Sequence, residues 1–319
     1  MNHKRSILKL AVAFGILAVA SVIVINWQSI LFNGTNLLIP PYDPAFYEKH
    51  YEVENGVTYV RDIDNGERYP VLRSFSDGFE NANTIRDLVG FQRGWTQFTL
   101  LSPEAPTVSD FNNLSHLILK GEGDFLDNRI EPSSEHAHSG TGSLKALAVA
   151  PVGGKCCTKA SLHTLLLHFV KGDHVWFSAW YFIEEAGDFI TLMDLESTYV
   201  RGWPGMRIRL HKEYLQFELA KWEPKAVYRQ PEGEEIPFPM GEWVLIEAHL
   251  LLSEDNDGVI QLWQNNELII DRLGQTLPFA GTLYDSLEIG ISAYSHGPGT
   301  AILYVDDLLI TGERMDELN

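Results

Sequence analysis

The chain has 319 residues, 45% hydrophobic and 21% charged, a composition that is ordinary for a globular protein. Its net charge of -19 excludes nucleic acid as an expected partner, because nucleic-acid binding depends on neutralising phosphates with Lys and Arg. The length allows one large domain with an extension.

The N-terminus holds a long apolar segment. Residues 10–25, LAVAFGILAVASVIVI, carry no charge and follow Lys4, Arg5 and Lys9. Basic residues before an apolar run predict that the N-terminus stays cytoplasmic and that the rest crosses the membrane. We therefore predict that residues 1–27 are a transmembrane signal-anchor, or a signal peptide if the chain is cleaved near Ala20. The main domain is expected to be membrane-anchored and extracytoplasmic (periplasmic or at the cell surface), and secreted in the cleaved case.

The middle of the chain divides by composition. Residues 28–73 mix Pro, Gly and aromatic residues without a sustained period, which predicts a linker or N-terminal extension. Within it, Val57–Val60 and the Asn65-Gly66 turn indicate a short hairpin. We place the main domain at residues 74–312 and a tail at 313–319.

Period-two alternation dominates the main domain. It predicts strands at 175–183, 189–195, 206–211 and 214–219, and further strands between Gly241 and Gly312 separated by polar turns such as Asn265-Asn266. Helix signals are weak, and residues 160–169 are the one short helix we expect here. The pattern predicts an all-β, two-sheet antiparallel sandwich.

Two adjacent cysteines, Cys156 and Cys157, are too few for a disulfide framework. A bridge between sequence neighbours is strained, so we expect two partly buried thiols or such a strained bridge. A redox or metal site is the alternative.

Several segments, in order, resemble the concanavalin A-like jelly-roll polysaccharide lyases, the group with heparin-, alginate- and glucuronan-lyase-type domains. The segments are FSDGFE from Phe75, Trp95, SGTGSLK from Ser139, VWFSAWYFI, GEWVLIEAHLLLS, DGVIQLWQNNELI and the terminal LYVDDLLI. The resemblance covers roughly residues 74–312 and implies a jelly-roll fold. It also implies β-elimination at a uronic acid, in which one residue neutralises the carboxylate, a base removes the C5 proton and an acid protonates the leaving oxygen.

The chain departs from the better-defined lyase motifs. Alginate-lyase-like enzymes carry an Arg-x-Glu-x-Arg strand and a Gln-x-His strand, whereas the nearest segments here are MRIRLH from Met206 and LMDLE from Leu192. Catalytic roles are therefore not transferred from the family by position.

Basic residues concentrate between Arg201 and Gln230, which hold seven of the 24 in the chain. In an extended strand Arg207, Arg209 and His211 share one face, and guanidinium groups in a row suit the binding of carboxylates or sulfates. The predicted ligand is an acidic polysaccharide, bound by these substrate-binding candidates: Arg207, Arg209, Lys221, Trp222 and Lys225. A solvated face whose arginines pair with the abundant acids is the alternative.

Three residues are candidates for proton transfer: His138, His211 and Tyr228. In an extended Glu-His-Ala-His segment, His136 and His138 lie on one face and can serve as a base or as metal ligands, although histidines beside a Ser-Gly turn are commonly exposed and idle.

Two further sets of acidic residues are candidates for a functional or metal-binding role. Asp194 and Glu196 share a strand face, as in glycoside hydrolases of this fold, but Leu192 stands where that pattern has its first carboxylate. A salt bridge to the arginines is the simpler role. Glu80, Asp306 and Asp307 lie at the two ends of the domain, whose strands are neighbours in such jelly rolls, so we predict that they hold one structural calcium ion; no organic cofactor is expected.

Three functions remain open: an acidic-polysaccharide lyase, a non-catalytic carbohydrate-binding or envelope-organising module, and a glycoside hydrolase that uses Asp194 and Glu196. A lyase needs a His or Tyr within about one sugar ring of the arginines. If the arginines instead close on Asp194, Glu196 and Glu218, they are not free to bind a substrate.

Overall fold

The computed structural model describes residues 51–313, except 62–65, 201, 223–224 and 280. The chain divides into two units, Met1–Asp43 and Pro44–Asn319, and all described residues belong to the second. The predicted anchor at residues 1–27 lies outside the described residues. Within those that are described, no helix is both long and apolar enough to cross a membrane.

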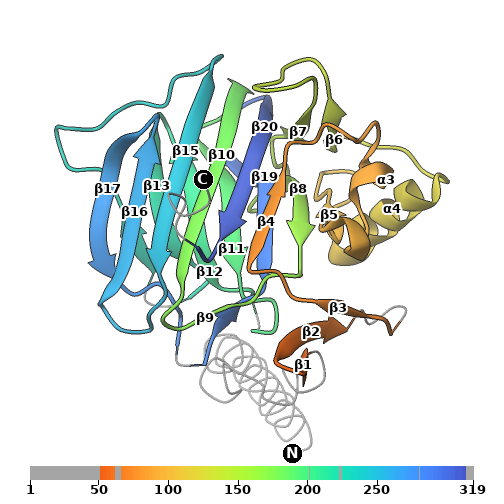
Figure 1. Cartoon of the computed structure of the whole chain (residues 1–319). Helices are drawn as coiled ribbons and strands as arrows, with labels where there is room; N and C mark the ends of the chain where they lie inside the picture. The colour runs from red at the N-terminus through yellow and green to blue at the C-terminus, as the bar shows by residue number, and fades with distance from the viewer. Residues whose placement is uncertain (1–50, 62–65, 201, 223–224, 280, 314–319) are drawn as a thin grey trace, which may run out of the picture. The chain divides into compact units, whose positions relative to one another are not determined.

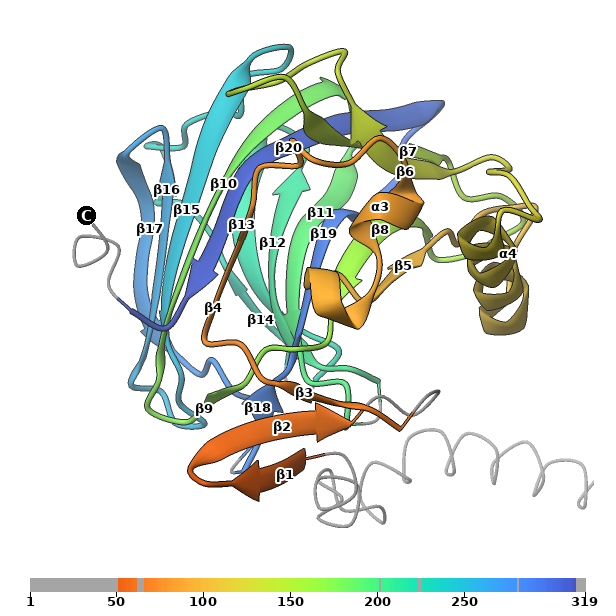
Figure 2. The same cartoon turned by 45° about the vertical axis from the view of Figure 1, so that its right-hand side comes forward.

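Two antiparallel sheets face each other across an apolar core (Figures 1 and 2), which confirms the predicted all-β sandwich. The eight-stranded sheet has the order β17-β16-β15-β10-β20-β7-β6, and β4 also pairs with β20. Its strands are β4 (Ser74–Asp77), β6 (Arg129–Ser133), β7 (Ser143–Val149), β10 (His174–Glu185), β15 (Trp243–Leu251), β16 (Gly258–Gln264), β17 (Glu267–Gly274) and β20 (Thr300–Thr311).

The seven-stranded sheet has the order β14-β13-β12-β11-β19-β8-β5. Its strands are β5 (Gln97–Thr99), β8 (Thr158–Thr164), β11 (Phe189–Glu196), β12 (Gly205–His211), β13 (Tyr214–Ala220), β14 (Ala226–Tyr228) and β19 (Ser286–His296). The four strands predicted between residues 175 and 219 are β10, β11, β12 and β13.

Smaller elements flank the sandwich. The strands β1 (Tyr51–Glu54), β2 (Val57–Arg61) and β3 (Arg68–Pro70) form a three-stranded sheet, and β9 (Phe169–Val170) pairs with β18 (Leu283–Tyr284). The helices are α3 (Ile85–Leu88), η1 (Phe91–Arg93) and α4 (Val108–Lys120). The pairing of β2 with β3 agrees with the hairpin expected around the Asn65-Gly66 turn.

The helix expected at residues 160–169 is wrong. Ala160 and Leu162 lie in the core, while Ser161 and His163 point to the other side of β8, so the segment alternates with a period of two. This strand pairs with β19 on one side and β5 on the other, and the pairing satisfies its backbone groups.

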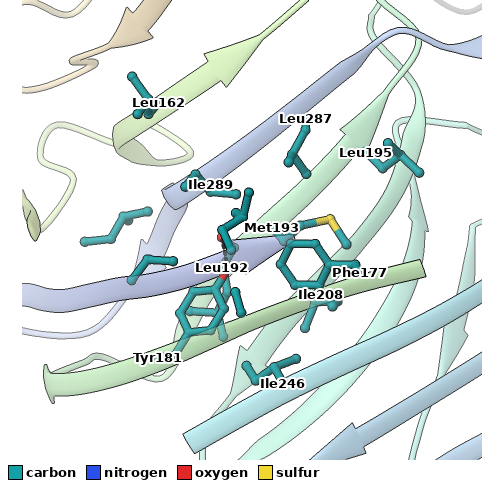
Figure 3. Close-up of a cluster of buried hydrophobic side chains, with 14 of the residues drawn as sticks. Leu162, Phe177, Tyr181, Leu192, Met193, Leu195, Ile208, Ile246, Leu287 and Ile289 are labelled. Carbon is teal, nitrogen blue, oxygen red and sulfur yellow. Dashed lines mark hydrogen bonds between the residues drawn. The ribbon is translucent and has the colours of Figure 1, made fainter. Parts of the chain in front are cut away.

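The core lies between the two sheets, as the close-up in Figure 3 shows for its centre. Phe177 and Tyr181 of β10 and Ile246 of β15 face Leu195 of β11 and Ile208 of β12. Each such side chain contributes about 1.5–3 kcal/mol when fully buried. Since alternate residues enter this core, the residues between them are left on the two outer faces of the sandwich.

Candidate functional site

Charged side chains cross the outer face of the seven-stranded sheet in one line. The strand register places His163 beside Glu288, Glu288 beside Asp194, Asp194 beside Arg207, and Arg207 beside Glu218. We call these five residues the charged row. Directly opposed residues in antiparallel strands lie within contact of each other, so the row is a continuous electrostatic unit.

Glu288 is the centre of one half of the row and is fully buried. Lys159 Nζ lies 3.1 Å from both Glu288 carboxylate oxygens, and Ser161 Oγ donates to one of them. His163 Nε2 lies 3.3 Å from the same carboxylate and 3.1 Å from Thr99 Oγ1. Burial opposes ionisation of Glu288, but Lys159 and His163 outweigh it and hold the pKa of this carboxyl well below its usual range.

Lys221 supplies the positive charge beside the other half of the charged row. Its ammonium group contacts Glu196 and lies 3.8 Å from Asp194 Oδ2, which also accepts a 3.1 Å hydrogen bond from Ser292. Lys221 directly follows β13 with φ of 58°, a left-handed conformation that is uncommon for a side chain of this size and occurs at functional sites. Burial, reinforced by the charge of Asp194, raises the pKa of Glu196 to about 8 against the pull of Lys221.

The acids of this face are buried, and its two lysines reach solvent. Asp194 and Glu196 expose 1% and 0% of their surface, whereas the side chains of Lys221 and Lys159 expose 31% and 21%. Asp194 and Glu196 thus form salt bridges, as the simpler reading of the sequence expected, but with Lys221 in place of the arginines. Their burial also leaves no surface on which a glycosidic bond can be cleaved.

Four buried polar atoms beside the row have no hydrogen-bond partner among the described residues: His163 Nδ1, Thr191 Oγ1, Asp194 Oδ1 and Glu196 Oε2. One carboxylate oxygen each of Asp194, Glu196 and Glu288 lies within 4.8 Å of the other two, so the three acids have the donor set of a cation site. Lys159 and Lys221 supply positive charge at the same place.

The two arginines of β12 close on one acid. Arg207 Nε donates to Glu218 Oε2 at 2.7 Å, and an Arg209 terminal nitrogen donates to the same oxygen at 2.8 Å. Arg209 also donates twice to Gln216 Oε1 and lies over the ring of Phe189. The guanidinium groups therefore have protein partners, which is one of the outcomes anticipated from the sequence.

His211 lies at the end of β12, on the same face as Arg209. The register places it directly opposite Tyr214 of β13, so an imidazole and a phenol are cross-strand neighbours there. Partial burial, with the positive charges of Arg209 and Lys212, lowers the pKa of His211. A lowered pKa favours the uncharged imidazole, which is the form that accepts a proton.

The remaining predicted site residues are one proton-transfer candidate, Tyr228, and two substrate-binding candidates, Trp222 and Lys225. Tyr228 lies opposite Phe217, packs against the core and donates to the Gln275 carbonyl at 3.2 Å. Trp222 also packs against the core, beside Phe279, while Lys225 is exposed.

His138 belongs to the other sheet. Its ring stacks on Trp180 of β10 at 3.7 Å, and its Nδ1 lies 2.7 Å from Asp307 Oδ2. It is thus placed with the residues predicted to bind calcium, away from Arg207 and Arg209.

The predicted calcium ligands converge on one loop. Glu80 accepts hydrogen bonds from the backbone of Thr141 and Gly142, and Asp306 accepts from the backbone of residues 138 and 139. Asp307 accepts from Ser139 Oγ at 2.7 Å. Residues 138–142 thus link Glu80, near the start of the domain, to Asp306 and Asp307, near its end. That these acids bind calcium stays a prediction.

Sequence reasoning did not place Lys159, His163 or Glu288 in the site, and it considered Tyr214 for sugar stacking but not for proton transfer. Tyr214 was detectable, because a short hairpin between 206–211 and 214–219 places it opposite His211. The other three reach the row only through pairing between strands that are distant in the sequence.

No protein-family model matches the sequence, and no curated protein matches it. Similar solved structures include an endo-β-1,4-glucuronan lyase from the fungus Trichoderma reesei, 10% identical, with a TM-score of 0.49 over 59% of this chain and 88% of the lyase. The cellulose-induced protein Cip1 is 19% identical, with a TM-score of 0.49 over 76% of this chain and 98% of Cip1. The alginate lyase Aly36B is 14% identical, with a TM-score of 0.43 over 76% of this chain and 98% of the lyase.

Polysaccharide lyases thus occur among the structures similar to this chain, as the sequence resemblance implied. With identities of 10–19% and TM-scores of 0.43–0.49, these similarities carry no argument about function, which rests on the chain's own residues.

Proposed function

We propose that this chain binds an acidic, uronate-containing polysaccharide on the outer face of the seven-stranded sheet and cleaves it by β-elimination. The observation that carries the proposal is the pair His211 and Tyr214, an imidazole directly across from a phenol, two residues from Arg209 on one strand face. We place the domain on the extracytoplasmic side of a membrane, following the apolar segment at residues 10–25.

The residues of this end of the sheet match the steps of β-elimination. Lys212 and Arg229 are exposed and their positive charges act on His211, so a uronate carboxylate beside them is partly neutralised, which acidifies the C5 proton. The His211 imidazole accepts that proton, and the Tyr214 hydroxyl donates one to the departing O4 oxygen.

Lys159 and Lys221 lie beside the charged row and add positive charge to the same face. Arg207 and His211 are four residues apart, which is about 13 Å along a strand. Lys159 and Lys221 lie near the Arg207 end, where their part-exposed ammonium groups are held by buried acids. They supply fixed positive charges for further uronates of the same polymer.

The test measures the ultraviolet absorbance of the unsaturated uronate that elimination leaves. The purified full-length chain in mild detergent is incubated with alginate, glucuronan, heparin, hyaluronan and pectate. We expect a rise with at least one polymer, and a loss of about a hundredfold or more in the variants His211→Gln and Tyr214→Phe. His116→Gln, which changes an exposed histidine of α4, is the matched control and keeps the activity.

The absence of the Arg-x-Glu-x-Arg and Gln-x-His strands favours a second function, a binding module without catalysis in which Lys159 and Lys221 hold the polymer. Its signature is retarded migration of the protein in gels that contain one of these polymers, with no absorbance change. Absence of both signals in the wild-type chain contradicts both functions.

A further inference from the structure

The two cysteines of the chain lie directly before β8, at one edge of the sandwich. Both are free thiols, Cys156 exposed and Cys157 partly buried, and their sulfurs are 3.2 Å apart, within hydrogen-bonding distance of each other. Because the chain has only these 2 cysteines, any disulfide within one chain must join them. They are therefore treated as one dithiol.

The backbone around the dithiol is adaptable on one side and anchored on the other. Residues 150–157 connect β7 to β8 and contain Gly153 and Gly154, whose φ values of 64° and 75° lie in the left-handed region. No described atom beyond their chain neighbours lies within 4 Å of the position that a Cβ would take at either glycine. On the other side, the Lys159 N–H donates to the Leu101 carbonyl at 2.8 Å. A change of backbone at the dithiol can therefore be absorbed by the glycines without disturbing β8.

A small pocket opens beside the two sulfurs. Its volume is about 120 Å³, and both cysteines line it. Its apolar walls are formed by Leu101, Pro103, Pro106 and Pro151. A short uncharged alkyl group can therefore lie against the sulfurs without desolvating a charge.

The two thiols have different roles to offer. Burial, together with the hydrogen bond and the charge of Cys156, raises the pKa of the Cys157 thiol to about 11. Cys157 therefore stays protonated, and the exposed Cys156 is the sulfur that an incoming reagent reaches first. Once Cys156 has formed a bond, its negative charge is gone, while the charges of Lys159 and Lys221 still favour the Cys157 thiolate.

We propose that Cys156 and Cys157 form a reversible redox site that reacts with small, uncharged disulfides. The Cys156 thiolate attacks one sulfur of the disulfide, which forms a mixed disulfide and releases one thiolate that takes up the proton lost by Cys156. Cys157 then gives up its proton and attacks the Cys156 sulfur. This step forms the bond between the cysteines, breaks the mixed disulfide and releases the second small thiol with that proton. The dithiol is oxidised, and the small disulfide is reduced to two thiols.

The bond between the cysteines is expected to reopen easily. A disulfide between sequence neighbours closes a small ring that contains the peptide link, and such a ring is strained. Strain makes a disulfide more readily reduced, and labile disulfides of this kind are suited to reversible modification. The reaction needs no glycan, so the redox site does not rest on the proposed function.

The experiment uses the full-length chain in mild detergent, fully reduced and then freed of reductant. It is incubated with hydroxyethyl disulfide, and the products are followed by intact-mass spectrometry and by titration of free thiols. We expect the chain to lose the mass of two hydrogen atoms and both free thiols, with no hydroxyethylthio group attached. Dithiothreitol then restores both thiols.

The variants separate the two roles. Cys157→Ser is expected to stop at the mixed disulfide and to keep one hydroxyethylthio group. Cys156→Ser reacts about tenfold or more slowly, because only the partly buried thiol of raised pKa remains. The double variant Cys156→Ser/Cys157→Ser is the matched control and keeps its mass, and thermal unfolding curves check that each variant is folded. A parent chain that keeps both thiols, carries a hydroxyethylthio group on each cysteine, or is linked only to other chains overturns the proposal.

Discussion

The two outer faces of the sandwich arise from the same strand alternation but carry opposite chemistry. On the seven-stranded sheet, buried acids such as Glu288 and Asp194 hold lysines that reach solvent. On the eight-stranded sheet, half-buried rings such as Trp176, Trp180 and Trp263 stack on histidines and on one another. Charge pairs in a low-dielectric site depend on each partner, whereas ring packing depends mainly on buried area. We therefore expect the removal of one charged partner on the first face to cost more stability than the removal of one ring on the second.

The largest effect is expected from Lys159→Met. It removes the lysine that pairs with the fully buried Glu288, which costs about 3–5 kcal/mol of unfolding free energy at pH 8. Urea unfolding measures this loss, which shrinks at pH 5 because the isolated acid can then take up a proton. Lys171→Met is the matched control, since it removes an exposed ion pair with Glu254 and costs less than about 1 kcal/mol. Equal losses at both pH values contradict the electrostatic role.

A smaller effect is expected from Glu196→Gln, in the pH dependence of stability. The folded state raises the pKa of this carboxyl from 4.5 to about 8, so the folded chain holds a proton that the unfolded chain has released between these values. The contribution of Glu196 is therefore complete below the unfolded pKa and is lost as pH rises toward 8, by up to about 1.4 kcal/mol per pH unit.

In Glu196→Gln this fall is absent, and urea unfolding between pH 5 and pH 8 gives a flatter profile than the wild type. The exposed-glutamate variant Glu267→Gln keeps the wild-type profile. A Glu196→Gln profile as steep as that of the wild type contradicts the assignment.

The smallest effect is expected on the aromatic face. Trp263→Leu removes the ring 6.4 Å from Trp176 and costs about 1 kcal/mol of unfolding free energy, mainly through lost packing. Because no charge is removed, the loss is the same with and without 0.5 M NaCl. A loss that changes with salt shows that the two faces differ less than proposed.

Local sequence patterns account for most of the sandwich. The alternation around Phe177, Leu192 and Ile208 identified β10 to β13, because a residue that enters a core recurs every second position in a strand. The helix α4 was missed although its signal was present, since Thr107 and Asp110 form the capping box that begins it. The segment of β8 was taken for a helix because its few apolar residues also fit a helical spacing.

The sequence predicted only those residues of the candidate site that lie close together in the chain. Arg207, Arg209 and His211 were identified because one strand carries all three, and Lys221 because it lies in the same basic stretch. Glu288 and Lys159 were not, since they join Asp194 and Glu196 only through the pairing of β19 with β8 and β11. The closure of both arginines on Glu218 was named beforehand as an alternative, and only the register decided it.

By itself, the sequence determined the strand periods, the acidic excess and the side of each strand on which a charge lies, because these depend on neighbours within a few residues. The tertiary structure decided which strands are adjacent, and hence that Glu288 meets Lys159 and that His174 meets His249. Strand pairing depends on the packing of the whole core, and no local pattern specifies which distant charge will lie opposite another.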